Sequence, residues 1–208
     1  GIFKDYEIDK VKSNMEMKRE DAIIEAINSI EPNAAVISTT GMASRELFEY
    51  RALKEMGHSR DFLTVGGMGH ANQIGLGLAS SQPNRPVYCF DGDGAALMHM
   101  GSLAIIGQSR RDNFIHILIN NGVHGSVGGQ PTVGFEIDFC KIAEACGYSY
   151  TAKIKKRNKI KEAIEKSRQI KGPCFIEIQT SPENKKNIGR PTSTPKENKE
   201  ELIKFLNN

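Results

Sequence analysis

The apolar positions along the chain predict an alternation of strands and helices. Short runs rich in apolar and β-branched residues predict strands at 34–38, 62–65, 87–90, 114–119, 149–154 and 174–179. Longer stretches with apolar residues at helical spacing predict helices at 17–30, 44–56, 70–81, 95–109, 137–146, 158–170 and 197–206. The runs at 87–90 and 114–119 contain almost no polar residue, which favours central strands of a parallel sheet.

The repeated strand–helix order predicts an α/β fold, a doubly wound parallel sheet with helices on both faces. We expect one domain over residues 17–182, and an extended tail with a short C-terminal helix over 183–208. Residues 1–16 are typical of a linker from a missing N-terminal domain or a partner, and the chain begins with Gly1 instead of methionine. Sheets of this type bind ligands beyond the carboxyl ends of their strands, so the site is expected there.

The composition excludes several classes of protein. The 208 residues are 38% hydrophobic and 25% charged, which indicates a globular protein. The net charge of +3 is too small to indicate nucleic-acid or membrane binding. The cysteines at 89, 140, 146 and 174 form no C-x-x-C pair. They favour free thiols in a reducing cytoplasm over a zinc site or a disulfide framework.

Two short polar motifs follow the two most apolar strands. Gly92-Asp93-Gly94 comes after the first, and Asn120-Asn121 comes after the second, with 27 positions between Asp93 and Asn120. This spacing fits strand, helix and return strand, so a carboxylate and an amide are expected at neighbouring strand ends. Their oxygens suit Mg²⁺, which commonly shares its ligands with phosphates. The glycines and the following helix N-terminus suit an anion, so the motifs predict a metal-bridged diphosphate.

Each motif taken singly indicates little, because Asp-Gly and Asn-Asn are common turn sequences. Two other nucleotide-binding motifs do not fit the chain. The segment after Gly92 lacks the third glycine of G-x-G-x-x-G, and the sequence contains no G-x-x-x-x-G-K-[ST]. A nicotinamide site and a P-loop are therefore disfavoured.

Together, these motifs resemble those of the thiamin-diphosphate-dependent decarboxylase family, in its diphosphate-binding, C-terminal domain. The segment 66–71, Gly-Gly-Met-Gly-His-Ala, resembles the family's turn beside the aminopyrimidine, and 38–41 resembles a strand end that touches the diphosphate. The glycine-rich loop at 120–132 and the tail at 189–195 most resemble the phosphonopyruvate decarboxylases. Sulfopyruvate decarboxylases are close relatives with a similar loop.

The resemblance implies roles for particular residues. The metal, Mg²⁺, would be held by Asp93, Asn121 and the carbonyl of Val123, while Asn120 supports the turn. Met68 would lie beneath the bent cofactor, and Met42 could contribute only its main chain. The full set of implied cofactor-binding residues is Thr40, Gly41, Met42, Gly66, Met68, Gly92, Gly94, Ala95, Asn121, Gly125 and Ser126.

The resemblance also implies a reaction and a partner. The expected activity is decarboxylation of a 2-oxo acid, with phosphonopyruvate giving phosphonoacetaldehyde in phosphonate biosynthesis. Alternatives are the β-type subunit of a sulfopyruvate decarboxylase, or a non-catalytic subunit for assembly. In the family, an activating glutamate comes from a pyrimidine-binding domain that this chain does not contain. We therefore expect a cytoplasmic oligomer in which this chain supplies half of the active site and is inactive alone.

Several further residues are candidates for contact with the substrate or for proton transfer. His70 and His124 are candidates for catalytic proton transfer, with a structural role as the alternative for each. Arg60 and Arg190 could bind a phosphonate, although surface positions are the simpler interpretation. His116 lies within an apolar strand and is expected in the core. The glycine-rich loop over 122–134 is a candidate lid.

Overall fold

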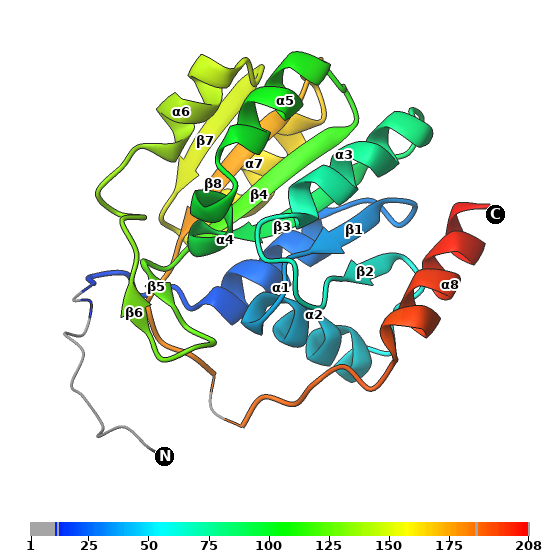
Figure 1. Ribbon diagram of the computed structural model, residues 1–208, viewed down its shortest axis with the longest axis horizontal. Coiled ribbons are helices and arrows are strands. Elements are labelled where there is room, and N and C mark those ends of the chain that lie inside the picture. Colours follow the sequence, from blue (N-terminus) through cyan, green and yellow to red (C-terminus); the bar gives the residue numbers. More distant parts are fainter. Residues whose placement is uncertain (1–10, 12, 186, 208) are drawn as a thin grey trace.

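The computed structural model describes residues 11, 13–185 and 187–207, and its centre is a six-stranded sheet (Figure 1). All neighbouring strands are parallel, in the order β2-β1-β3-β4-β8-β7. The strands are β1 (Ala35–Ser38), β2 (Asp61–Leu63), β3 (Val87–Gly92), β4 (Phe114–Asn120), β7 (Tyr150–Ile154) and β8 (Cys174–Gln179). The predicted doubly wound sheet is confirmed, and its strand order reverses direction between β1 and β3.

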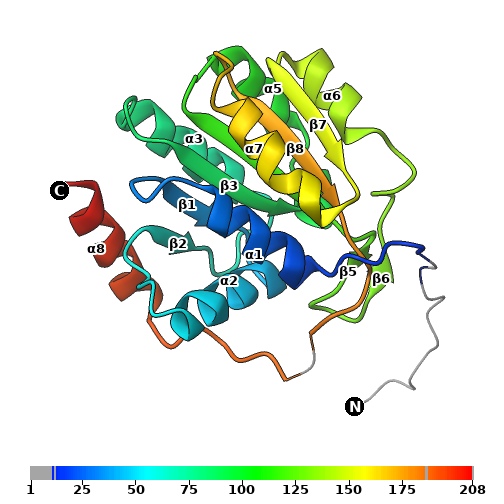
Figure 2. The ribbon, with the colours of Figure 1, turned by 180° about the vertical axis from the view of Figure 1, so that it is seen from behind.

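Helices cover both faces of the sheet. On one face lie α1 (Arg19–Ser29), α2 (Met42–Leu53) and α7 (Ile160–Ser167), seen in front in Figure 2. On the other face lie α3 (Ala71–Ser81), α4 (Asp93–Met98), α5 (Gly101–Ser109) and α6 (Phe139–Cys146), seen in front in Figure 1. The last helix, α8 (Pro195–Leu206), lies beside the edge strand β2.

The sheet separates two hydrophobic cores. Successive side chains of a strand point to opposite faces, so Tyr88 and Phe90 enter the core beneath α1 and α2. Val87 and Cys89, which alternate with them in the sequence, enter the core beneath α3 and α5. Both cores consist of buried apolar side chains, which explains why the central strands lack the polar alternation of a solvent-facing sheet.

Two predicted elements differ from the structure. The helix expected at 95–109 is divided into α4 and α5, because His99 leaves the helical conformation (φ −134°, ψ 45°). The turn at Gly69 approaches this break so closely that a Cβ there would lie 2.4 Å from the His99 ring. The glycine-rich loop contains a small antiparallel hairpin, β5 (Val123–His124) with β6 (Gln130–Pro131), where only a loop was expected. A 3₁₀ turn, η1 (Arg157–Lys159), precedes α7.

The C-terminal helix protects the edge of the sheet through one side chain. The buried Asn198 of α8 accepts a hydrogen bond from the Leu63 N–H (2.9 Å) and donates one to the Asp61 carbonyl (2.7 Å). An amide side chain thereby replaces a neighbouring strand along β2. The helix begins with a capping box between Thr194 and Glu197 and with Pro195 in its first turn, which fixes its start.

The chain enters the domain beside the segment that leaves the sheet. The Ser181 N–H, just after β8, donates to the Met17 carbonyl at 2.8 Å, and Figure 2 shows these segments crossing. The linker predicted for residues 1–16 falls mostly outside the described residues, so it stays a prediction. Of the described helices, none combines the length and the apolar character that crossing a bilayer requires.

Candidate cofactor and metal site

The two polar motifs meet at the carboxyl edge of the sheet. Asp93 is the first residue of α4, directly after β3, and Asn120 ends β4. The strand register places Gly92 opposite Ile119, so both motifs begin at the same level of the sheet. The site therefore lies next to the point between β1 and β3 where the strand order reverses, where sheets of this class bind their ligands.

Three oxygen atoms converge at this edge. The side-chain amide of Asn121 has two orientations related by a half-turn. In one of them, its Oδ1 lies 3.2 Å from Asp93 Oδ1 and 3.0 Å from the carbonyl oxygen of Val123. Oxygens that carry no hydrogen repel one another at this range, and a bound cation would relieve that repulsion.

The spacing of these oxygens fits a small divalent cation. Mg²⁺ takes octahedral oxygen ligands at about 2.1 Å, which puts neighbouring ligands roughly 3 Å apart. The two separations, 3.2 and 3.0 Å, agree with that edge length. The donor set of one carboxylate, one amide and one carbonyl is also the chemistry that a hard cation prefers. The residues present therefore fit the metal that the sequence predicts.

The carboxylate of Asp93 is held in a buried environment. Burial raises the pKa of Asp93 above its usual range, although hydrogen bonds from Thr132 and from backbone N–H groups act in the opposite direction. The Thr132 hydroxyl donates to Oδ2, the carboxylate oxygen that does not face Asn121. Among the described residues, Asp93 has no cationic side chain as a partner. A bound cation would supply the missing counter-charge.

A cleft beside Asp93, which we call the Asp93 cleft, brings together most of the predicted cofactor-binding residues. Besides Asp93, Asn121 and Val123, its lining includes Thr40, Met42, Met68, Gly92, Gly94, Ala95, Gly125 and Ser126. A Cβ on Gly92 would meet nothing within 4 Å, so the backbone there faces open space. Within the described residues, the N–H groups of Gly125 and Ser126 form no backbone hydrogen bond. These features suit a phosphate-bearing ligand.

Two predicted residues lie outside that lining. Gly41 lines a larger neighbouring cavity of about 440 Å³, which we call the tail cavity and which shares Thr40 and Ser126 with the Asp93 cleft. Gly66 is exposed, and its N–H donates to the Thr40 hydroxyl at 3.3 Å. The turn that carries Gly66 is therefore hydrogen-bonded to the segment that follows β1.

The candidate catalytic histidines occupy different surroundings. His124 lines the Asp93 cleft, and its ring lies so close to Gly94 that a Cβ there would be 2.5 Å away. His70 is exposed, forms a hydrogen bond with the Gly67 carbonyl (3.1 Å) and packs against the His99 ring. His70 does not line the cleft. The geometry thus brings only His124 to the predicted metal ligands.

A buried polar chain lies beneath the site, and the sequence patterns did not indicate it. Asp91, fully buried in β3, accepts hydrogen bonds from Asn72 (3.1 Å) and from the Gly92 N–H (2.9 Å). His116 bridges Asp91 (3.3 Å) and the Tyr148 hydroxyl (3.1 Å), which confirms it as a hydrogen-bonded core residue. The one feature of the sequence that could have indicated Asp91 is its position as a lone carboxylate at the end of an apolar strand.

Asn120 connects both ends of the glycine-rich loop to the sheet. Its Nδ2 donates to the Gly134 carbonyl (2.6 Å) and to Glu177 of β8 (2.9 Å), and its Oδ1 accepts from the Gly122 N–H (3.2 Å). The Thr132 N–H also donates to the Gly122 carbonyl at 2.8 Å. The candidate lid at 122–134 is therefore anchored at both ends in this structure.

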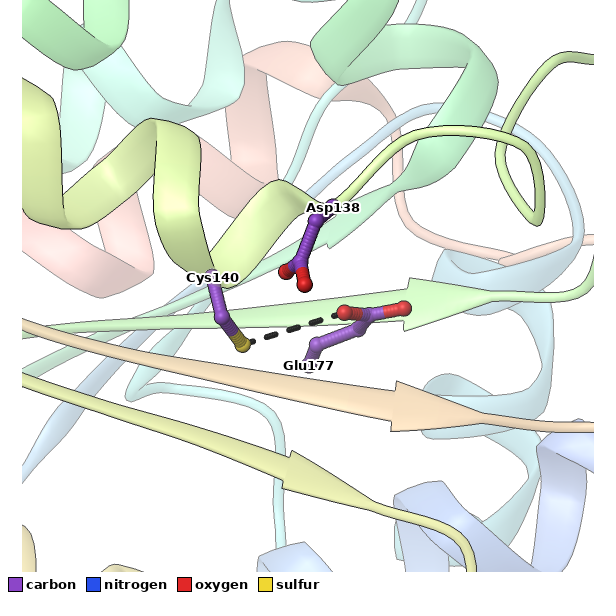
Figure 3. Close-up of side chains that lie close together, drawn as sticks. All are labelled: Asp138, Cys140 and Glu177. Carbon is purple, nitrogen blue, oxygen red and sulfur yellow. Dashed lines mark hydrogen bonds between the residues drawn. The ribbon is translucent and has the colours of Figure 1, made fainter.

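Glu177 also belongs to a separate cluster of side chains that could ligate a metal (Figure 3). Asp138, Cys140 and Glu177 bring one possible metal-ligating atom each to within 4.8 Å of one another. The Lys153 ammonium lies 3.1 Å from Asp138 and 3.7 Å from Glu177, so a side-chain cation already offsets part of the charge of the two carboxylates. Burial raises the pKa of Cys140 to about 12, which keeps its sulfur a thiol. The cluster is better explained as an internal ion pair than as a metal centre.

The two candidate arginines lie at opposite edges of the sheet. Arg60 donates to the carbonyls of Glu31 (2.7 Å) and Pro32 (3.0 Å), at the amino ends of β1 and β2, which is the edge opposite the Asp93 cleft and favours a structural role. Arg190 lines the tail cavity together with Arg45, on the same edge as the Asp93 cleft. Only Arg190 is therefore placed near the site.

Comparisons with known proteins agree with the geometry. Residues 39–178 match the family described as thiamine pyrophosphate enzyme, C-terminal TPP binding domain. The chain is 39% identical over 165 residues to phosphonopyruvate decarboxylase from Streptomyces viridochromogenes, covering 79% of this chain and 40% of that protein. It is 30% identical over 192 residues to sulfopyruvate decarboxylase subunit beta from Methanococcus maripaludis, covering 92% of this chain and 99% of that subunit.

Similarity to a solved structure concerns the fold alone. A thiamin diphosphate-dependent enzyme from Mycobacterium smegmatis superposes with a TM-score of 0.60 at 18% identity, over 80% of this chain and 32% of that one. The chain spans about two fifths of the length of the phosphonopyruvate decarboxylases that it matches. The match over 39–178 contains both polar motifs, and the chain therefore belongs to the thiamine pyrophosphate enzymes, as a C-terminal TPP binding domain.

Proposed function

We propose that this chain is the half of a 2-oxo acid decarboxylase that binds thiamin diphosphate and Mg²⁺. The observation that carries the proposal is the approach of the Asn121 side-chain amide to the Asp93 carboxylate (3.2 Å) and to the Val123 carbonyl (3.0 Å), a spacing that suits neighbouring ligands of Mg²⁺. The free N–H groups of Gly125 and Ser126, on the wall of the same cleft, would bind the diphosphate.

The chain's own residues would position the reacting groups. Bound thiamin diphosphate supplies an electron sink for the bond that breaks when a 2-oxo acid loses carbon dioxide. Met68 would pack under the cofactor and the exposed Gly66 carbonyl would accept a hydrogen bond from its amino group. His124 is the better placed histidine for proton transfer, because it lines the cleft while His70 packs against His99.

Phosphonopyruvate is the proposed substrate, and phosphonoacetaldehyde the product, in phosphonate biosynthesis. Two phosphonopyruvate decarboxylases match at 39% and 38% identity. Sulfopyruvate decarboxylase beta subunits match at 30–36% identity, and they keep sulfopyruvate as the second candidate. The Methanococcus maripaludis subunit is aligned over 99% of its length, which supports a separate subunit of this size.

The proposal includes a partner. A pyrimidine-binding domain or subunit would supply the activating glutamate, so we propose a cytoplasmic oligomer with a shared active site. Relatives that are named as beta subunits support this arrangement. The four free thiols support a reducing compartment.

The experiment is a reconstitution. The chain would be mixed with the pyrimidine-binding partner, Mg²⁺ and thiamin diphosphate, and carbon dioxide release measured from phosphonopyruvate and from sulfopyruvate. We expect turnover of phosphonopyruvate that requires the partner. Preferential turnover of sulfopyruvate would favour the second candidate, and robust turnover by this chain alone would contradict the shared site. A non-catalytic assembly subunit would give no turnover with either acid.

A further inference from the structure

Arg19 is a buried arginine that reaches the Asp93 cleft. It begins α1 and only 7% of it is exposed. Its Nε and Nη2 donate to the two carboxylate oxygens of Glu46, each at 2.9 Å, and Nη2 also donates to Asn184 at 3.1 Å. Glu46 on α2 thus fixes the plane of the guanidinium and leaves Nη1 directed at the cleft.

The Nη1 atom of Arg19 lies 3.3 Å from the side-chain amide of Asn121. Within the described residues, that amide is the sole hydrogen-bond partner available to Nη1. When the amide oxygen faces Arg19, it accepts from Nη1, and the amide nitrogen donates to Asp93 (3.2 Å) and to the Val123 carbonyl (3.0 Å). This orientation gives hydrogen-bond partners to Nη1, to Asp93 and to the Val123 carbonyl without a cation, and it gives up only the long bond (3.4 Å) from the Val123 N–H to Asn121 Oδ1.

The opposite orientation of Asn121 serves a cation and releases Arg19. With Oδ1 toward Asp93 and Val123, the three oxygens converge, and the amide nitrogen faces Nη1 at 3.3 Å. Two donors then oppose each other, so the Nη1 hydrogens need a new acceptor in the cleft. Metal binding and the Arg19–Asn121 hydrogen bond therefore exclude each other.

The released donor lies on the same wall as the free N–H groups of the glycine-rich loop. Asn184, which accepts from Arg19, donates to the Gly125 carbonyl at 2.8 Å. A Cβ on Gly125 would lie 2.5 Å from the Asn184 side chain, so this contact leaves no room for a larger residue. Arg19 and the Gly125–Ser126 segment are thereby held in one arrangement, as a preformed anion site requires.

On the basis of the proposed function, we propose that Arg19 binds the diphosphate of the cofactor only after a divalent cation has turned the Asn121 amide. Arg19 is then a further binding residue, and Asn121 couples the two ligands. The cation raises the affinity for diphosphate because it frees Nη1, and diphosphate raises the affinity for the cation to the same extent. Lysine cannot replace Arg19, because it lacks the planar fork that pairs with Glu46 while Nη1 stays free.

The test measures the affinity for the cation and the affinity for the diphosphate separately, in the complete enzyme that contains this chain. Mn²⁺, a spectroscopic substitute for Mg²⁺, is titrated alone, and inorganic pyrophosphate is titrated at saturating Mg²⁺. The variant is Arg19→Gln with Glu46→Gln, which leaves no unpaired buried charge. We expect pyrophosphate affinity to fall at least about tenfold, as for loss of a charge-assisted hydrogen bond, and Mn²⁺ affinity to stay equal or rise.

A fall in pyrophosphate affinity without a fall in Mn²⁺ affinity distinguishes a binding role of Arg19 from a purely structural one. A structural role would weaken both ligands together, and that result overturns the proposal, as does unchanged pyrophosphate affinity. The matched control is Arg51→Gln with Asp61→Asn, a second buried bidentate pair, which joins α2 to β2 outside the Asp93 cleft and should change neither affinity. If the wild-type enzyme binds neither Mn²⁺ nor pyrophosphate, the proposed function fails together with this inference.

Discussion

The hydroxyl of Thr132 donates a hydrogen bond to Oδ2 of Asp93, and Oδ1 of the same carboxylate faces Asn121. One oxygen of Asp93 is therefore tied to the far end of the glycine-rich loop, and the other is left free for the proposed metal ion. This contact fixes the rotation of the carboxylate, as partners of metal ligands do in other proteins.

Removing the Thr132 hydroxyl is expected to weaken the metal site. Thr132→Val keeps the side-chain shape but leaves Oδ2 of Asp93 without its donor. Metal affinity should fall about tenfold, in the range observed for such partners. A Mn²⁺ titration followed by electron paramagnetic resonance measures this. Thr132→Ser, which keeps a hydroxyl, should stay close to wild type, and equal affinities for all three proteins would contradict the assigned role.

A methyl group at Gly92 is expected to block the ligand without harming the fold. Gly92 has φ −110° and ψ 154°, which alanine adopts readily, and a Cβ there would meet no atom of the protein within 4 Å. The free energy of unfolding of Gly92→Ala should change by less than about 1 kcal/mol. Its affinity for thiamin diphosphate should fall clearly. Gly101→Ala is the control, because a Cβ there also meets nothing within 4 Å but lies on α5 outside the cleft.

The edge of the sheet is expected to depend on Asn198. Asn198→Ala would leave the Leu63 N–H and the Asp61 carbonyl without their partners. At about 1–3 kcal/mol for each of the two unsatisfied buried groups, the loss of stability should be roughly 2–6 kcal/mol in urea unfolding. Glu201→Ala, at an exposed position of the same helix, should have almost no effect. A loss below about 0.5 kcal/mol for Asn198→Ala would show that water replaces the amide.

The cysteines are expected to differ in reactivity. Burial raises the pKa of Cys140 and of Cys174 to about 12, so near neutral pH both stay almost entirely as unreactive thiols. Cys146 is only half-buried and should be the thiol that iodoacetamide modifies in the folded protein. Peptide mass spectrometry gives the sites, and denatured protein is the control in which all four react. Fast alkylation of Cys140 would contradict its pairing with Glu177.

The sequence predicted the sheet well because each strand has a local signal. The apolar runs at β3 and β4 are long enough to identify central strands, and the motifs after them follow from chain order alone. The break between α4 and α5 had no such signal, since it depends on the approach of Gly69 from a distant turn. Local patterns specify elements, while breaks of this kind are imposed by tertiary packing.

The partners of the site residues were harder to predict than the residues themselves. Thr132 meets Asp93 across 39 positions, and Arg19 meets Glu46 across 27 positions, so neither contact has a periodic signature. Arg60 was a candidate ligand by charge alone, and its hydrogen bonds to Glu31 and Pro32 place it at the wrong edge of the sheet. Residue type indicates what a side chain can do, and only the fold decides what it meets.

The central claim is that Asp93 and Asn121 hold a divalent cation that binds thiamin diphosphate. Calorimetric titration of the enzyme with thiamin diphosphate tests it most directly, with and without Mg²⁺, for wild type and for Asp93→Ala. We predict saturable binding by the wild type that requires Mg²⁺, and loss of that binding in Asp93→Ala with the thermal unfolding transition retained. Equal binding by the two proteins, or binding by the wild type that is indifferent to Mg²⁺, would contradict the account.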